Sequence, residues 1–160
     1  MASTPLQLAF VTLLPVAVCA VLALLRKRTS IANAPNMSWQ IAVGIVFGLV
    51  AILCAVVKVP VFNTTVSLAD AAPLAAGLFF GGPAGILAGI LGALGHWFNS
   101  ALDANNVTRL ADSLGCVLAG IYAALLRKHL FDDRMPSWPM ALATAIVAEV
   151  MLSAFEETSL

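Results

Sequence analysis

Long runs of apolar residues, with little alternation of apolar and polar positions, make up most of the chain. A helix that crosses a bilayer needs about 20 mostly apolar residues. Four runs meet this length, and they cover residues 5–25, 39–57, 107–126 and 138–155. Ser38 precedes the second run and is a candidate for its N-cap. The pattern therefore predicts four spanning helices.

The stretch between the second and third runs is also apolar, but it is interrupted at Gly81-Gly82-Pro83. Glycine and proline end helices, and proline fits the first turn of the next one. We predict two short segments, residues 67–80 and 83–98, which form either two spans or a re-entrant hairpin. Short, interrupted segments at membrane depth are tolerated where they face protein or a wet cavity. The predicted fold class is all-α, a polytopic transmembrane bundle of about six segments.

Composition agrees with a membrane protein and excludes several other classes. Hydrophobic residues make up 61% of the chain and charged residues 10%, whereas soluble domains are about 25% charged. Eight basic residues balance eight acidic ones, which leaves no basic surplus for nucleic acid. The three cysteines lie in apolar runs without a CxxC pair. We expect no catalytic site, metal or cofactor.

Basic residues predict the orientation of the bundle. Arg26–Arg28 form one cluster, and Arg127, Lys128 and Arg134 form another that we place in a loop. With six segments both clusters fall on one side, and the positive-inside rule makes that side cytoplasmic. We therefore expect a multi-pass membrane protein with its N-terminus outside.

Small residues mark the faces on which helices are expected to pack. Glycines recur at spacings of three and four from Gly85 onward, and Gly44 and Gly48 form a GxxxG pair. In lipid, such positions let helix backbones approach closely. The predicted helix-packing residues are Gly44, Gly48, Gly81, Gly82, Pro83, Gly85, Gly89 and Gly92.

Ionisable residues inside apolar segments are the candidates for function, because such groups are costly in a membrane unless paired or wetted. Asp70, His96, Arg109 and Asp112 fall toward the outer ends of their segments in this topology, and the polar Asn63 lies in an outer loop. We predict that these five residues form a ligand-binding pocket open to the outside.

Each ionisable residue also has a structural alternative. Asp70 suits the N-cap of the third segment, and Arg109 with Asp112 suits an ion pair at i,i+3. His96 suits the aromatic belt at the membrane interface. Glu149, midway along the last run, either bonds a neighbouring helix or relays a conformational change.

Several stretches, taken together and in order, resemble the LytS-type five-transmembrane receptor module. They are residues 44–61, 78–85 (LFFGGPAG), 90–98 (ILGALGHWF) and 116–124 (CVLAGIYAA). The resemblance implies the membrane sensor region of a bacterial two-component histidine kinase or diguanylate cyclase. Some members respond to small carboxylates such as pyruvate, and some act in cell wall organization.

The chain departs from the pyruvate-sensing members at the residues that meet the ligand. Ala69 and Trp97 stand where those members carry arginine, and Asp112 and Gly115 stand about where they carry cysteine and serine. With Asp70 and Asp112 in place, a cationic or zwitterionic ligand is the more natural electrostatic partner. The expected ligand is a small acid, amine or amino acid.

The family pattern continues beyond residue 157 with a further span and an output domain. We therefore expect residues 1–160 to be a single sensor module, truncated before that span, that forms a homodimer through the missing output domain and contacts lipid but no nucleic acid. One alternative is an S-component-like subunit that captures substrate for a small-molecule importer. Another is a structural membrane protein without a ligand.

Overall fold

The helical segments predicted from the apolar runs form a bundle. The computed structural model describes residues 4–28, 36–56, 59–61, 64–66, 69–98, 106–132 and 134–158. Its helical elements are α1 (Thr4–Arg28), α2 (Met37–Val56), α3 (Ala71–Ala75), the π-helical turn η2 (Ala76–Phe80), α4 (Gly82–Phe98), α5 (Asn106–His129) and α6 (Trp138–Thr158). Since η2 continues α3, these described residues form six helical segments, and the all-α prediction is confirmed.

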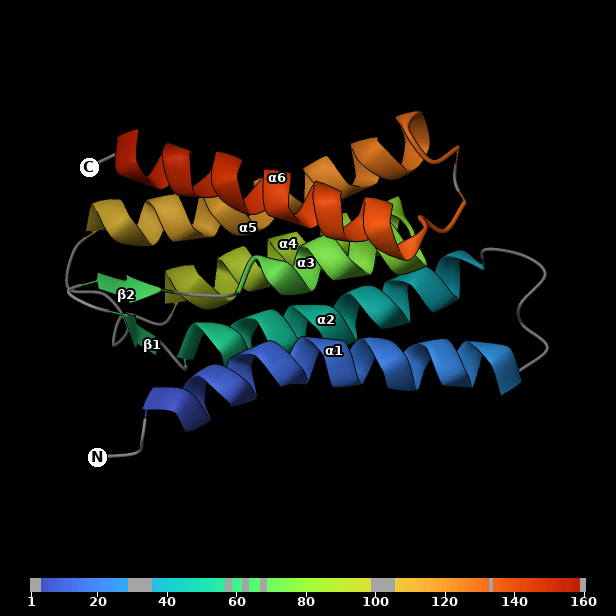
Figure 1. The fold of residues 1–160 in the computed structure, drawn as a ribbon, viewed down its shortest axis with the longest axis horizontal. Helices are drawn as coiled ribbons and strands as arrows, with labels where there is room; N and C mark the ends of the chain where they lie inside the picture. The colour runs from blue at the N-terminus through green and yellow to red at the C-terminus, as the bar shows by residue number, and fades with distance from the viewer. Residues whose placement is uncertain are drawn as a thin grey trace.

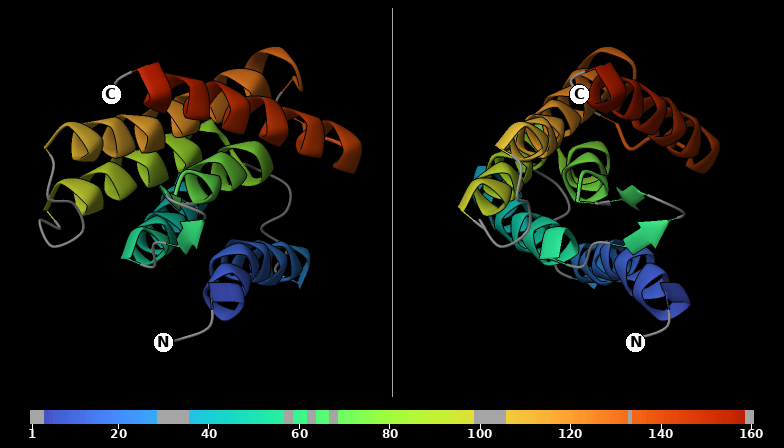
Figure 2. Two further views of the ribbon diagram at one scale, coloured as in Figure 1. Left: turned by 60° about the vertical axis from the view of Figure 1, so that its left-hand side comes forward. Right: turned by 90° about the vertical axis from the view of Figure 1, so that its left-hand side faces the viewer.

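The five longer helices run side by side along the bundle (Figure 1), and seen from one end they form an arc around α3 and η2 (Figure 2, right). Seen from one end, α1, α2, α4, α5 and α6 follow one another around this arc, and α3 lies inside it (Figure 2). The central helix α4 packs most extensively against α2 and α5. The short helix α3 contacts α2, α4 and α5 and therefore lies within the bundle.

Two helix boundaries differ from the sequence prediction. The backbone N–H of Trp39 donates to the carbonyl of Asn36 at 2.9 Å, and α2 begins before Ser38. Ser38 is therefore inside the helix, and its predicted N-cap role is wrong. Further along the chain, α5 continues to His129, so the prediction that Arg127 lies in a loop was also wrong.

A short β-hairpin follows α2 where the sequence analysis expected only a loop. Strands β1 (Val59–Val61) and β2 (Thr64–Val66) pair antiparallel, with Val59 opposite Val66 and Val61 opposite Thr64. Valine and threonine favour strands, and Pro60 is tolerated because a two-stranded ribbon has free edges. The hairpin lies at the end of the bundle where α5 begins (Figure 1), referred to below as the hairpin end.

The opposite end, referred to below as the turn end, holds the turn between η2 and α4. The backbone N–H of Gly81 donates to the carbonyl of Ala76 at 3.3 Å, five residues back, as in a π-helix. Gly81 then takes a φ of 139°, a conformation that side chains with a Cβ rarely adopt. This glycine ends η2, and α4 begins at Gly82.

Gly81→Ala is expected to lower the free energy of unfolding by about 1–2 kcal/mol, because it forces a side chain into a strained backbone region. A Cβ here would also lie 2.9 Å from Nε2 of Gln40. Thermal unfolding of the detergent-purified protein measures the effect. Ile90→Val, at an exposed position of α4, is the control, and equal melting midpoints for the two variants would contradict the strain.

Glycines bring α4 close to both of its main neighbours. A Cβ on Gly48 of α2 would lie 2.6 Å from the Cβ of Leu91, and one on Gly89 of α4 would lie 2.6 Å from the carbonyl oxygen of Cys116 on α5. Real Cβ atoms do not approach other atoms so closely, so these contacts require glycine. Such contacts between backbones are a usual means of holding membrane helices together.

Two helical stretches among the described residues are long and apolar enough to cross a membrane, judged by length and composition alone. They are Met37–Val56 and Leu110–His129. The remaining apolar helical stretches among those residues are shorter: Thr12–Leu25, Ala71–Phe80, Gly82–Phe98 and Pro139–Ala148.

Candidate functional site

Asp70 lies at the start of α3, inside the arc, and its side chain contacts α5. The thiol of Cys116 donates to Oδ1 of Asp70 at 3.1 Å. Asp70 occupies the N-cap position of α3, but its side chain makes no capping hydrogen bond. The carboxyl group also lies over Gly115, where a Cβ would be 3.2 Å from Oδ2. Asp70 thus joins α3 to α5 and does not cap its own helix.

His96 and Asp112 form a second polar pair at the hairpin end. Nδ1 of His96, near the end of α4, lies 3.8 Å from Oδ2 of Asp112, near the start of α5. The His96 side chain is 1% exposed and that of Asp112 is 19% exposed. The aspartate is therefore partly exposed, while the imidazole is enclosed by protein and is not part of an exposed aromatic belt.

Two residues that the sequence analysis did not select complete the polar cluster. Ser113 is buried, and its hydroxyl donates to the carbonyl of Ala93 on α4 at 3.3 Å. Cys116 is fully buried and contacts Asp70 as described above. Helical spacing could have revealed Cys116, because it follows Asp112 by four residues and so shares its face of α5.

The other predicted site residues are only partly covered by the structure. The backbone of Arg109 belongs to α5 and that of Glu149 to α6, but their side chains lie outside the described residues. Asn63 lies outside them altogether. The predicted pairing of Arg109 with Asp112 therefore stays a prediction.

The described cluster comprises two carboxyl groups, an imidazole, a thiol and a hydroxyl, contributed by the start of α3, the end of α4 and the first half of α5. Among the described residues no group of three or more His, Cys, Asp or Glu side chains is placed to hold a metal ion. In a water-poor setting, hydrogen bonds and charge interactions are stronger than in water. The two carboxyl groups therefore favour positive charge in their vicinity.

Comparison with known proteins identifies the family. The model of the family described as 5TMR of 5TMR-LYT matches residues 22–156, most of the chain. No curated protein and no solved structure matches the sequence. The family consists of multi-pass membrane modules that serve signalling proteins as sensory receptors and are not catalytic. The chain belongs to this family, the LytS-type five-transmembrane receptor modules.

Proposed function

We propose that this module binds a small extracytoplasmic ligand at the hairpin end and passes the signal, by repacking of its helices, to an output domain. The output would be that of a bacterial histidine kinase or a similar signalling protein. The observation that carries the proposal is the side-chain bridge between Asp70 on α3 and Cys116 on α5. A ligand that competes for this carboxyl group alters the contact between an inner segment and a long helix.

The charges of the site support a ligand that carries a positive group. Asp70 and Asp112 supply two carboxyl groups, and His96 is the basic side chain paired with one of them. An amine or the ammonium group of an amino acid is the matching partner. Arg109 lies one helical turn before Asp112 in the sequence of α5, and it is our candidate partner for the carboxylate of a zwitterionic ligand.

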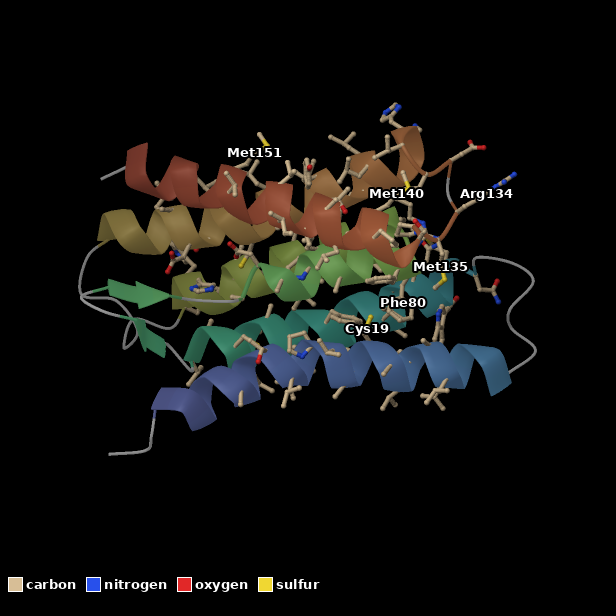
Figure 3. The ribbon with its side chains drawn as sticks, in the orientation of Figure 1. Cys19, Phe80, Arg134, Met135, Met140 and Met151 are labelled. Atoms are coloured by element: carbon tan, nitrogen blue, oxygen red, sulfur yellow. The ribbon has the colours of Figure 1, made fainter. Side chains whose placement is uncertain are left out.

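The distribution of basic residues supports a cytoplasmic location for the turn end. Arg26–Arg28 close α1, and Arg134 lies in the loop before α6 at the turn end (Figure 3). Arg127 is engaged within the bundle, but Lys128 and Arg134 remain exposed. By the positive-inside rule the hairpin end then faces outward. We place the module in a bacterial plasma membrane with its N-terminus outside.

A receptor changes state only if its ligand prefers one helix arrangement over another. Coupling free energies between sites are typically about 1–3 kcal/mol, comparable to a few hydrogen bonds. The family match supports this receptor role over that of an importer subunit. The homodimer expected through an output domain is part of the same proposal.

A ligand screen by thermal unfolding tests the function. Detergent-purified protein is heated with small acids, amines and amino acids, and we expect an amine or amino acid to raise the melting midpoint. Asp70→Asn removes a charge from the site and is expected to reduce this shift by at least half.

Asp132→Asn is the matched control. Asp132 is exposed at the turn end, after α5, and its φ of 49° is one that asparagine also tolerates. We expect it to leave the shift unchanged. A screen without any stabilising compound, or equal shifts in both variants, would refute ligand binding at Asp70.

A further inference from the structure

The carbonyl group of Leu78, in η2, needs a hydrogen-bond donor from outside its own helix. In a π-helical turn its partner would be the N–H five residues ahead, but that residue is Pro83, which has no N–H. The positive φ of Gly81 ends the helix in between. Leu78 therefore carries one of the carbonyl groups that the end of a helix leaves without a partner.

Arg127, from the last turns of α5, supplies the donor. Its Nη1 atom donates to the carbonyl oxygen of Leu78 at 2.9 Å, and the residue is 8% exposed. A cation is favourable at the C-terminal end of a helix because it compensates the partial negative charge there. The guanidinium group thus fastens η2 to α5.

The packing around this contact connects η2 to the turn end of α5 and to α6. A Cβ on Gly77 would lie 2.5 Å from the Cβ of Ala123, so η2 and α5 touch closely. Leu78 shares a buried apolar cluster with Phe131, which follows α5, and with Ala148 of α6. A movement of η2 would therefore displace α5 and α6, the two helices on either side of the loop at the turn end.

We propose that the contact between Arg127 and the Leu78 carbonyl is a conformational latch that holds η2 in its π-helical form and is closed in this structure. π-Helical turns recur at functional sites. Release of the carbonyl lets the end of η2 move away from α5 and shift α3 with it. That shift takes the Asp70 carboxyl group away from Cys116.

The latch has two states, closed and open. Changes at the hairpin end and at the turn end both shift the equilibrium between these states. It rests on the proposed receptor function for its biological role, since a ligand at Asp70 would act on the latch through α3. Its test uses no ligand, so a failed ligand screen and a failed latch are separate results.

The reactivity of the Cys116 thiol reports on the latch from a distance. Cys116 lies eleven residues before Arg127, about 16 Å along α5. In a Cys19→Ala/Cys54→Ala background, N-ethylmaleimide labels Cys116 alone, and mass spectrometry of protein in nanodiscs gives the rate. Arg127→Gln is expected to speed labelling about tenfold, as for loss of a hydrogen bond with a charged donor. Arg134→Gln, at an exposed site of the same region, is expected to change nothing.

A purely structural role for Arg127 is distinguished by a second substitution. Asp70→Ala removes the partner of Cys116, so in that background Arg127→Gln is expected to accelerate labelling less than about twofold. General loosening would instead multiply the rate by the same factor in both backgrounds. That result, or an Arg127→Gln rate equal to the parent rate, would overturn the latch.

Arg127→Lys covers the case in which Arg127→Gln does not fold. Lysine keeps the charge but lacks the planar fork of donors, so we expect a smaller acceleration, about threefold. This acceleration must also disappear in the Asp70→Ala background. If it persists there, the latch is refuted.

Discussion

Gly85→Val is expected to prevent folding or to lower the free energy of unfolding by about 3 kcal/mol or more. This is the upper end of the range for substitutions that insert extra atoms into a packed core. A Cβ on Gly85 would lie 2.6 Å from the Cα of Gly77 in η2. In turn, a Cβ on Gly120 of α5 would overlap the carbonyl group of Gly85. Three backbones thus meet at three glycines, and backbone atoms cannot rotate away as the end of a side chain can.

Thermal unfolding in detergent, together with the folded fraction from size-exclusion chromatography, measures this effect. Ile86→Val is the matched control, because Ile86 is the next residue on α4 and is 38% exposed. Its effect should stay within about 0.5 kcal/mol, as for other surface substitutions. A Gly85→Val protein as stable as this control would show that the three segments do not meet as described.

The long elements of the fold could be predicted because hydrophobicity sets them. Helices α1, α2, α5 and α6 follow the apolar runs to within a few residues, since a membrane requires such runs. The π-helical turn could not be predicted in this way, because the residues of a π-helical turn are as hydrophobic as those of the α-helix around it. The β-hairpin is only three residues per strand, too short for an alternating pattern to be recognised.

Arg127 and Gly77 show why contacts between distant segments escape a reading of the chain. Arg127 looked like a loop charge because it follows an apolar run, yet its partner is a backbone carbonyl 49 residues away. Gly77 was not among the predicted packing residues, since it lies outside the spaced glycines of α4. Its role follows from its position opposite Ala123, which only the folded structure shows.

The candidate site was predictable where charge marks it and not where it consists of small polar groups. Asp70, His96 and Asp112 stand out because ionisable residues are rare in apolar segments. Cys116 and Ser113 look like ordinary packing residues in such a segment. The described pairs join different helices: His96 contacts Asp112, and Asp70 contacts Cys116. Sequence spacing predicts pairs within one helix much more easily than pairs between helices.

Asp70→Ala and Cys116→Ala are expected to be non-additive in the free energy of unfolding by about 2 kcal/mol, the usual range for a hydrogen bond with a charged group. Each single variant already loses the bond between the thiol and the carboxyl group, so the double variant loses it only once. Thermal unfolding of the four proteins of this double-mutant cycle measures the coupling.

A parallel cycle with Asp132→Ala in place of Asp70→Ala should be additive within about 0.5 kcal/mol, because Asp132 is exposed at the turn end of the bundle. Additive effects of Asp70 and Cys116 would mean that their 3.1 Å contact contributes nothing to stability. A measured coupling would mean that α5 holds the Asp70 carboxyl group before any ligand arrives. Under the proposed receptor function, an incoming cation would then displace the thiol, and this exchange of partners would link occupancy of the site to the position of α3.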